Sequence, residues 1–192
     1  PMVKTLFAES SDPRTRLHAL YVLEGMGALD AGIVKEALMD PAPGVRENAA
    51  ILAEKFPACL SQLQQLVEDN SIRVAYQATF SLGEFNDKGI IPWLAKSVVL
   101  HGKSKWFRAA VLSSDAGSSI ELLDALSNSN FADKAADWKT DFYKELAETI
   151  GARNQKAQVA ALLQQSGQNT ITKLPNAQAA IVKGLSAGLQ NA

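Results

Sequence analysis

The chain has 192 residues, of which 47% are hydrophobic and 20% are charged, and its formal net charge is −1. This length fits one domain or one uninterrupted array of repeats, and the hydrophobic fraction is sufficient for a packed core. The near-neutral charge argues against a nucleic-acid binder, because such proteins usually carry a visible basic excess.

The first helix is predicted from Pro13 to about Gly25, with Asp12 as its N-cap and Asp30 as the N-cap of the helix that follows. Its apolar stripe, read with a period of 3.6, consists of Leu17, Leu20, Val22, Leu23 and Met26. The second helix continues the stripe through Ile33, Val34, Ala37, Leu38 and Met39.

A short pattern then recurs. An aspartate is followed four to six residues later by an arginine, and one turn further on by alanine. The aspartates Asp12, Asp40 and Asp69 are 28 and 29 residues apart. A fixed period of this size predicts stacked helical pairs rather than a domain closed around a single core.

The whole chain, 1–192, is therefore expected to be one array of about five helical pairs. The predicted units are 12–39, 40–68, 69–100, 102–126 and 133–165, followed by a terminal helix over 175–190. In the fifth unit Gly151 is expected to separate the two helices, and Pro175 to open the last helix after a polar link over 166–173.

The repeated positions have structural interpretations. Alanine suits places where two helices approach closely, here Ala19, Ala49, Ala50, Ala78 and Ala109. The aspartates are interpreted as helix caps. The arginines Arg16, Arg46, Arg73 and Arg108 should align, either as an anion-binding stripe or as partners of the repeat aspartates. We favour pairing, since a chemical site is normally built once.

The single cysteine, Cys59, excludes an internal disulfide. It is interpreted as a small buried residue. The alternative, a nucleophile, needs a base, and the only histidines, His18 and His101, are not placed by the sequence. No apolar run approaches the ~20 residues that span a membrane. The chain begins Pro-Met-Val, so we expect a piece of a longer polypeptide.

The pattern Asp-x-x-x-x-Val-Arg-x-x-Ala resembles the HEAT repeat, and the short units are similar to the bacterial HEAT subclass of phycobilin lyases. The likeness is best over 12–112. It implies an all-α fold, a right-handed α-α superhelix of HEAT-like, armadillo-like type, with the second helices lining the concave face.

Three segments, 17–29, 45–49 and 106–114, are also similar to the middle part of exported multidomain dehydrogenase-like bacterial proteins. Those proteins add a β-propeller and a c-type haem domain. The haem signature Cys-x-x-Cys-His is absent here. This resemblance implies a noncatalytic scaffold in an exported, periplasmic redox protein, with a cytoplasmic location as the alternative. The implied partners are a protein, a peptide or neighbouring domains.

Chemical motifs are scarce. No P-loop, His-Glu-x-x-His or Gly-x-Ser-x-Gly occurs, and no catalytic, cofactor or metal residue is assigned. Asp133, Asp137 and Asp141 would share a helix face if their helix begins early; acids at a helix start are favoured over a metal site.

The enzymatic alternative is a DNA glycosylase of the alkylpurine type built on HEAT-like pairs, and a cofactor lyase is a further alternative. A glycosylase needs tryptophans, an aspartate and an arginine, and the chain could supply Trp93, Trp106, Trp138, Asp115 and Arg108. Tryptophans at apolar helix positions are more often core residues.

Overall fold

The computed structural model describes residues 2–167, 171 and 173–192. In this part of the chain all regular secondary structure is helical, which confirms the predicted all-α class. The chain divides into two compact units, Pro1–Phe85 and Asn86–Ala192, and each is described by itself. Among the described residues no helix is both long and apolar enough to cross a membrane.

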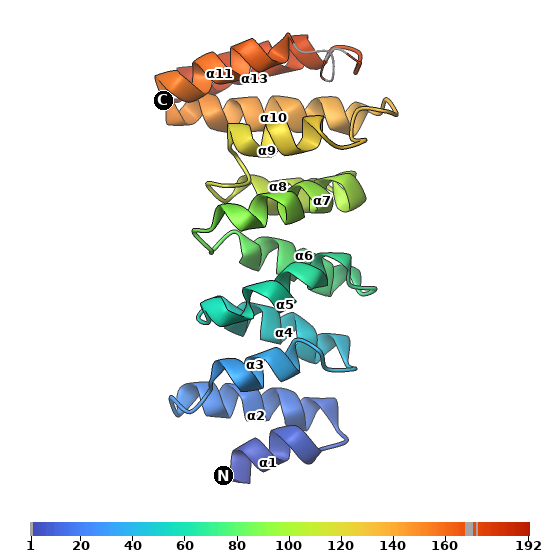
Figure 1. Cartoon of the computed structure of the whole chain (residues 1–192), viewed down its shortest axis with the longest axis vertical. Coiled ribbons are helices and arrows are strands. Elements are labelled where there is room, and N and C mark those ends of the chain that lie inside the picture. Colours follow the sequence, from blue (N-terminus) through green and yellow to red (C-terminus); the bar gives the residue numbers. More distant parts are fainter. Residues whose placement is uncertain (1, 168–170, 172) are drawn as a thin grey trace. The chain divides into compact units, whose positions relative to one another are not determined.

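Unit 1 consists of short helices that follow one another in chain order (Figure 1). Its α-helices are α1 (Met2–Glu9), α2 (Pro13–Gly25), α3 (Ala31–Ala37), α4 (Pro43–Ala53), α5 (Leu60–Gln65) and α6 (Ile72–Leu82), with 3₁₀ turns at Pro57–Cys59 and Leu66–Glu68. Helix α1 lies before the first repeat and was not predicted. Its Phe7 is buried and the helix packs on α2.

The predicted caps of the first pair are confirmed. Asp12 accepts hydrogen bonds from the amides of Arg14 (3.2 Å) and Thr15 (3.3 Å), and Pro13 is the first residue of α2. Asp30 accepts one from the amide of Ile33 at 3.0 Å. Both carboxylates satisfy amides that an N-terminal helical turn leaves unpaired.

The capping role expected of the other two repeat aspartates is wrong. The N-cap of α4 is Ala42 and that of α6 is Ser71. Asp40 and Asp69 lie two residues earlier and accept the amides of those two residues, at 2.7 and 2.8 Å. They therefore brace the turn before the helix.

The alanines predicted at close approaches between helices are buried in unit 1. They are Ala19, Ala49, Ala50 and Ala78. The predicted apolar stripe is too wide, because Val22, Met26 and Met39 are exposed. Met26 and Met39 lie beyond the ends of α2 and α3, where helical periodicity no longer applies.

Unit 2 begins with a 3₁₀ turn at Lys88–Ile90. Its α-helices are α7 (Ile91–His101), α8 (Lys105–Leu112), α9 (Ile120–Ser127), α10 (Asp137–Arg153), α11 (Lys156–Ser166) and α13 (Ala177–Gln190). Of the predicted polar link over 166–173, residues 168–170 and 172 lie outside the described residues. The last helix starts at Ala177 rather than Pro175, because Asn176 adopts a left-handed conformation, φ 62°.

The expected break at Gly151 is also wrong. Helix α10 continues through Gly151 to Arg153 and ends at Asn154, which is left-handed with φ 50°. A Cβ atom on Gly151 would lie 2.7 Å from the carbonyl oxygen of Leu185 in α13. The glycine therefore serves helix contact rather than helix termination.

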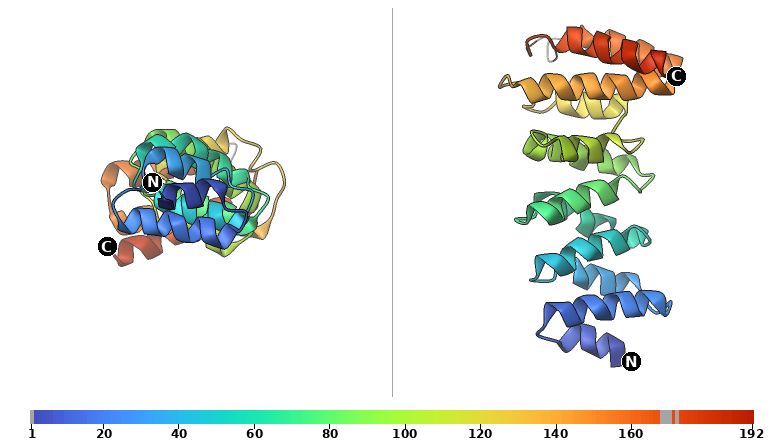
Figure 2. Two further views of the ribbon diagram at one scale, coloured as in Figure 1. Left: turned by 90° about the horizontal axis from the view of Figure 1, so that it is seen from below. Right: turned by 180° about the vertical axis from the view of Figure 1, so that it is seen from behind.

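Helices α10 and α13 lie side by side (Figures 1 and 2). On α13, a Cβ atom at either Gly184 or Gly188 would lie 2.1 Å from a backbone oxygen of α10, that of Lys144 or Glu148. Glycines one helical turn apart thus let the two backbones touch, and a methyl group would separate them.

Candidate functional site

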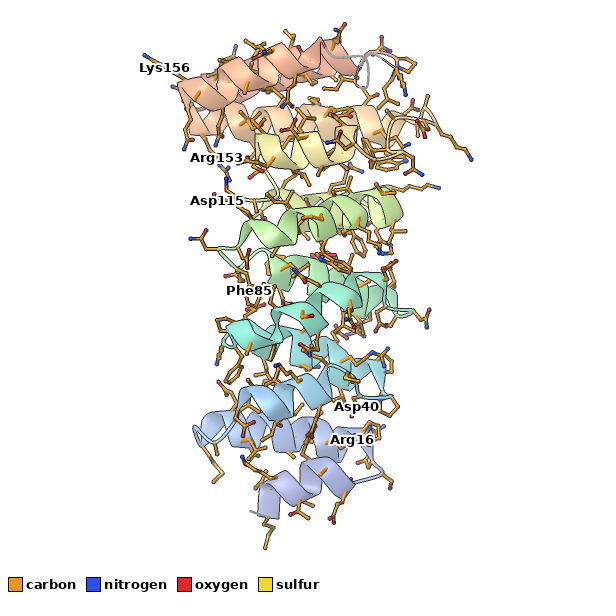
Figure 3. The ribbon with its side chains drawn as sticks, in the orientation of Figure 1. Arg16, Asp40, Phe85, Asp115, Arg153 and Lys156 are labelled. Carbon is orange, nitrogen blue, oxygen red and sulfur yellow. The ribbon has the colours of Figure 1, made fainter. Side chains whose placement is uncertain are left out.

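The repeated arginines are the first candidate site, because an aligned row of cations could bind an anion. Arg16 donates from Nε and Nη2 to the two carboxylate oxygens of Asp40, at 2.6 and 2.7 Å (Figure 3). Its Nη1 donates to the carbonyl oxygen of Ser10 at 2.9 Å. Arg46 repeats this geometry with Asp69, at 2.7 and 2.8 Å, and with the carbonyl oxygen of Asp40.

These two pairs are largely shielded from water. Burial by itself raises the pKa of Asp40, but the hydrogen bonds from Arg16 and Ala42 and the charges of Arg16 and Arg46 outweigh it, leaving that pKa below its usual value. The same balance lowers the pKa of Asp69. Pairing with the next repeat's aspartate is therefore confirmed for Arg16 and Arg46.

The prediction is wrong for Arg73. Its side chain is 77% exposed and pairs with Glu47 at 3.0 Å. The third repeat has Val74 where the second has Val45, so Ala75, not Arg73, occupies the position of Arg46. The sequence pattern allowed four to six residues between the aspartate and the arginine, and this allowance concealed the two-residue shift of Arg73.

Arg108 does occupy that position in unit 2, as its Nη1 donates to the carbonyl oxygen of Gly102, six residues back, at 3.1 Å. Its carboxylate partner is Glu145 of α10, at 2.8 and 2.9 Å, instead of a turn aspartate. The turn before α8 contains no acid. Arg108 is buried and its donors are engaged within the chain.

An open groove of about 600 Å³ lies between α8 and α10, and Glu145 is one of its lining residues. It is the candidate site, and we call it the Trp106 groove. Its lining residues are Lys105, Trp106, Ala109, Leu112, Glu145, Glu148, Thr149 and Ala152. Trp106 is 64% exposed, and Lys105 Nζ stands 5.1 Å from the centre of its ring.

Two sequence interpretations fail in this groove. Trp106 is not a core residue, and Ala109 is exposed rather than closely packed. The neighbouring Phe107 and Ala110 are buried in their place. The period of α8 identified its apolar residues correctly, but it could not show which face the rest of unit 2 leaves open.

The other glycosylase-type residues belong to separate contacts. Trp93 is half-buried with Lys96 Nζ 5.0 Å from its ring centre. Trp138 lies against Gly102, where a Cβ atom would be 2.5 Å from its ring, and packs edge-on to Phe131. Asp115 pairs with Arg153 at 2.8 Å (Figure 3). Arg108 and Asp115 are thus held in different ion pairs.

The three spaced acids do not share one helix. Helix α10 begins at Asp137, so Asp133 lies before it, 3.8 Å from Lys173. Asp137 stands in the first turn, where a negative charge is favoured, and with Asp141 it lines a cleft of about 250 Å³. Within the described ranges no three His, Cys, Asp or Glu residues are grouped so as to hold a metal ion.

Cys59 is buried, as expected, and its Sγ lies 3.6 Å from the carbonyl oxygen of Ala31. Burial raises the pKa of this thiol, which disfavours the thiolate that a nucleophile requires. His101 stacks on Phe107, with ring centres 4.5 Å apart.

No known family model matches this chain, and no curated protein sequence matches it either.

Proposed function

We propose that this chain is a noncatalytic, HEAT-like repeat domain that binds a protein or peptide segment. The observation that carries the proposal is the Trp106 groove, where a large aromatic ring, an exposed alanine and a half-buried leucine face solvent together. Exposing a tryptophan this far leaves apolar surface in water that a partner would cover, and tryptophan is enriched among the residues that dominate binding energy.

The engaged arginines support the same reading. Arg16, Arg46 and Arg108 each direct three donor atoms into the chain itself. Such arginines build a scaffold, because recruiting Arg16 or Arg46 to a ligand would leave the shielded carboxylate of Asp40 or Asp69 unpaired. In this proposal the α-solenoid presents a surface and performs no chemistry.

The domain's context is part of the proposal. We infer a spacer in a larger exported, periplasmic redox protein, holding an oxidising module near an electron acceptor. This rests on the similarity of segments 17–29, 45–49 and 106–114 to such proteins. Sequencing the parent gene tests it: propeller and haem domains flanking the repeats are expected, and a reading frame containing the repeats alone would remove it.

Binding is tested by selecting peptides from a random phage-displayed library and recording amide chemical shifts of the labelled chain with each selected peptide. Shifts should concentrate in α8 and α10, and Trp106→Ala should weaken binding at least tenfold, as expected for a hot-spot tryptophan. Ile72→Ala, which removes a side chain that is 59% exposed in α6, is the matched control. Failure to select any binder, or equal binding by the Trp106 variant, contradicts the proposal.

A further inference from the structure

Three exposed apolar side chains occupy the same position in successive repeats of unit 1. The position lies five residues after that of Arg16 and Arg46, and in α2, α4 and α6 it holds Tyr21, Ile51 and Phe80. Their exposed fractions are nearly equal, at 40%, 39% and 41%. Helix α2 contacts α4, and α4 contacts α6 (Figure 1). We call these three side chains the exposed row.

Hydrogen bonds join the outward sides of neighbouring helices close to the exposed row. The hydroxyl of Tyr21 donates to Oδ1 of Asn48 in α4 at 2.8 Å. Ser81 of α6 donates from its hydroxyl to the carboxylate of Glu54, just past the end of α4, at 2.5 Å. The row is therefore one continuous strip of surface across three helices rather than three separate side chains.

Each member of the exposed row is followed three or four residues later by a glutamate. These acids are Glu24, Glu54 and Glu84. Residues three and four apart lie on the same side of a helix, so the acids line one edge of the row. Lys55 lies at this edge and pairs with Glu24. Three carboxylates against one ammonium group leave two negative charges along the edge.

The two remaining carboxylates repel each other. Burial raises the pKa of Glu54, and the negative charge of Glu84 raises it further, while the hydrogen bond from Ser81 and the charge of Lys55 lower it without cancelling the rise. Among the ion pairs of the described residues, neither Glu54 nor Glu84 has a cationic partner. A cation placed beside these two acids would relieve their repulsion.

The other cations of the three helices do not offset this charge. Arg16 and Arg46 are paired within the repeat turns, and Arg73 is paired with Glu47. Arg14 lies in the first turn of α2, about 15 Å along the helix from Glu24. The edge of the exposed row is therefore negative, and its charge selects a basic partner.

We propose that the exposed row binds a basic amphipathic peptide segment, whose apolar side chains cover Tyr21, Ile51 and Phe80 and whose lysines or arginines lie beside Glu54 and Glu84. The apolar contacts remove hydrophobic surface from water, and the charges select the class of segment. The row belongs to unit 1 and the Trp106 groove to unit 2, so this inference goes beyond the proposed function and does not depend on it.

The test compares two synthetic 18-residue peptides of leucine and lysine that differ only in acetylation of every lysine, which removes the charge. Titration into the full chain by fluorescence anisotropy should show tighter binding of the unmodified peptide. Each of the two new ion pairs should contribute about two- to fivefold, and added salt should reduce the difference.

Variants of the acidic edge locate the effect. The double variant Glu54→Gln/Glu84→Gln should lose the preference for the unmodified peptide, and Glu84→Gln alone, at an exposed side chain, should lose part of it. The matched control is Glu9→Gln/Glu36→Gln, the same change of charge at two exposed acids of unit 1, which should keep the preference. Thermal unfolding checks that each variant is folded.

Variants of the apolar row provide the second arm. Phe80→Ala should weaken binding of both peptides about fivefold or more, whereas Ile72→Ala, at another exposed side chain of α6, should not. Trp106→Ala should also leave this binding unchanged. Among the phage-selected peptides, those that shift amides of α2, α4 and α6 count toward the exposed row, and those that shift α8 and α10 count toward the Trp106 groove.

Equal affinities of the two peptides would indicate a purely apolar partner and overturn the inference. No binding of either peptide, or a preference that survives in Glu54→Gln/Glu84→Gln, overturns it as well. Sedimentation that shows the chain binding its own copies, with Phe80→Ala abolishing this association, would assign the row to self-association instead. In each of these cases the Trp106 groove keeps its own test.

Discussion

Arg46 and Asp69 meet through two parallel hydrogen bonds, of 2.7 and 2.8 Å, that join α4 to the turn before α6. The third donor atom of Arg46 reaches back to the carbonyl oxygen of Asp40, so one side chain joins the turn before α4 to the turn before α6. Arg16 does the same for the turns before α2 and α4. The pattern repeated in the sequence therefore encodes ion pairs that join every second turn of unit 1.

Removing one member of this pair should be costly. Arg46→Ala leaves the shielded carboxylate of Asp69 without its partner, and we expect a loss of about 2–4 kcal/mol in unfolding free energy, measured by urea denaturation. Arg73→Ala, which removes the exposed pair with Glu47, should cost under about 1 kcal/mol. If the two losses are equal, the brace has no special importance.

The same pairs should make the protein sensitive to acid. The pKa values of Asp40 and Asp69 are lowered in the folded state. Their contribution is therefore complete above the unfolded value of about 3.9 and is lost as the pH falls through the folded values. The unfolding free energy measured by denaturation should decline below about pH 4. The Asp69→Asn variant should show a smaller decline over the same pH range. A flat profile down to pH 2 would contradict this.

Glu54 should behave in the opposite way. Burial raises the pKa of Glu54, and repulsion from the nearby Glu84 adds to the rise. The hydrogen bond that the hydroxyl of Ser81 donates to its carboxylate, at 2.5 Å, lowers this pKa but does not cancel the effect of burial. A raised folded pKa means that ionised Glu54 costs stability at neutral pH, and that this cost disappears as the pH falls through the folded value towards the unfolded one. Glu54→Gln should therefore stabilise the chain at pH 7, with an advantage that shrinks as the pH falls through the folded pKa of Glu54. Glu36→Gln, at an exposed position, should show neither effect.

The contact between α10 and α13 should tolerate no side chain on its glycines. In Gly184→Ala the new methyl group would lie 2.1 Å from the carbonyl oxygen of Lys144, so the helices must separate, at a cost of about 1–3 kcal/mol. Gly167→Ala is the control, since its nearest atom would be 3.8 Å away. Differential scanning calorimetry should show a clear drop in melting temperature for the first variant alone.

Binding to duplex DNA is expected to be negligible. The net charge is −1, and the buried Arg108 is fully engaged with Glu145 and Gly102. A gel shift at low salt, about 50 mM, where phosphate contacts are strongest, should show no retarded band at micromolar protein. A salt-sensitive complex would return the glycosylase alternative to consideration.

Local chemistry accounts for what could be predicted from the sequence. Asp12, Pro13 and Asp30 act within three residues of their own position, so the starts of α2 and α3 could be predicted from neighbouring residues. The periodic aspartates and arginines also indicated the Arg16–Asp40 and Arg46–Asp69 pairs, because a repeated unit repeats its contacts. The all-α class follows from the same short-range information.

Tertiary packing decided the rest. Whether Arg73 or Ala75 continued the row depended on a two-residue register, and the partner of Arg108 came from a helix 37 residues further along the chain. Gly151 could end a helix or press against another, and only the approach of α13 selected the second. Trp106 and Ala109 are apolar residues of α8, and the sequence does not distinguish them from its buried residues. They line a groove because α10 leaves their face of α8 uncovered. The sequence by itself determined the helical class, the starts of α2 and α3 and the repeated residues, since those depend on neighbours in the chain. The tertiary structure alone decided which faces are covered, since burial depends on neighbours in space.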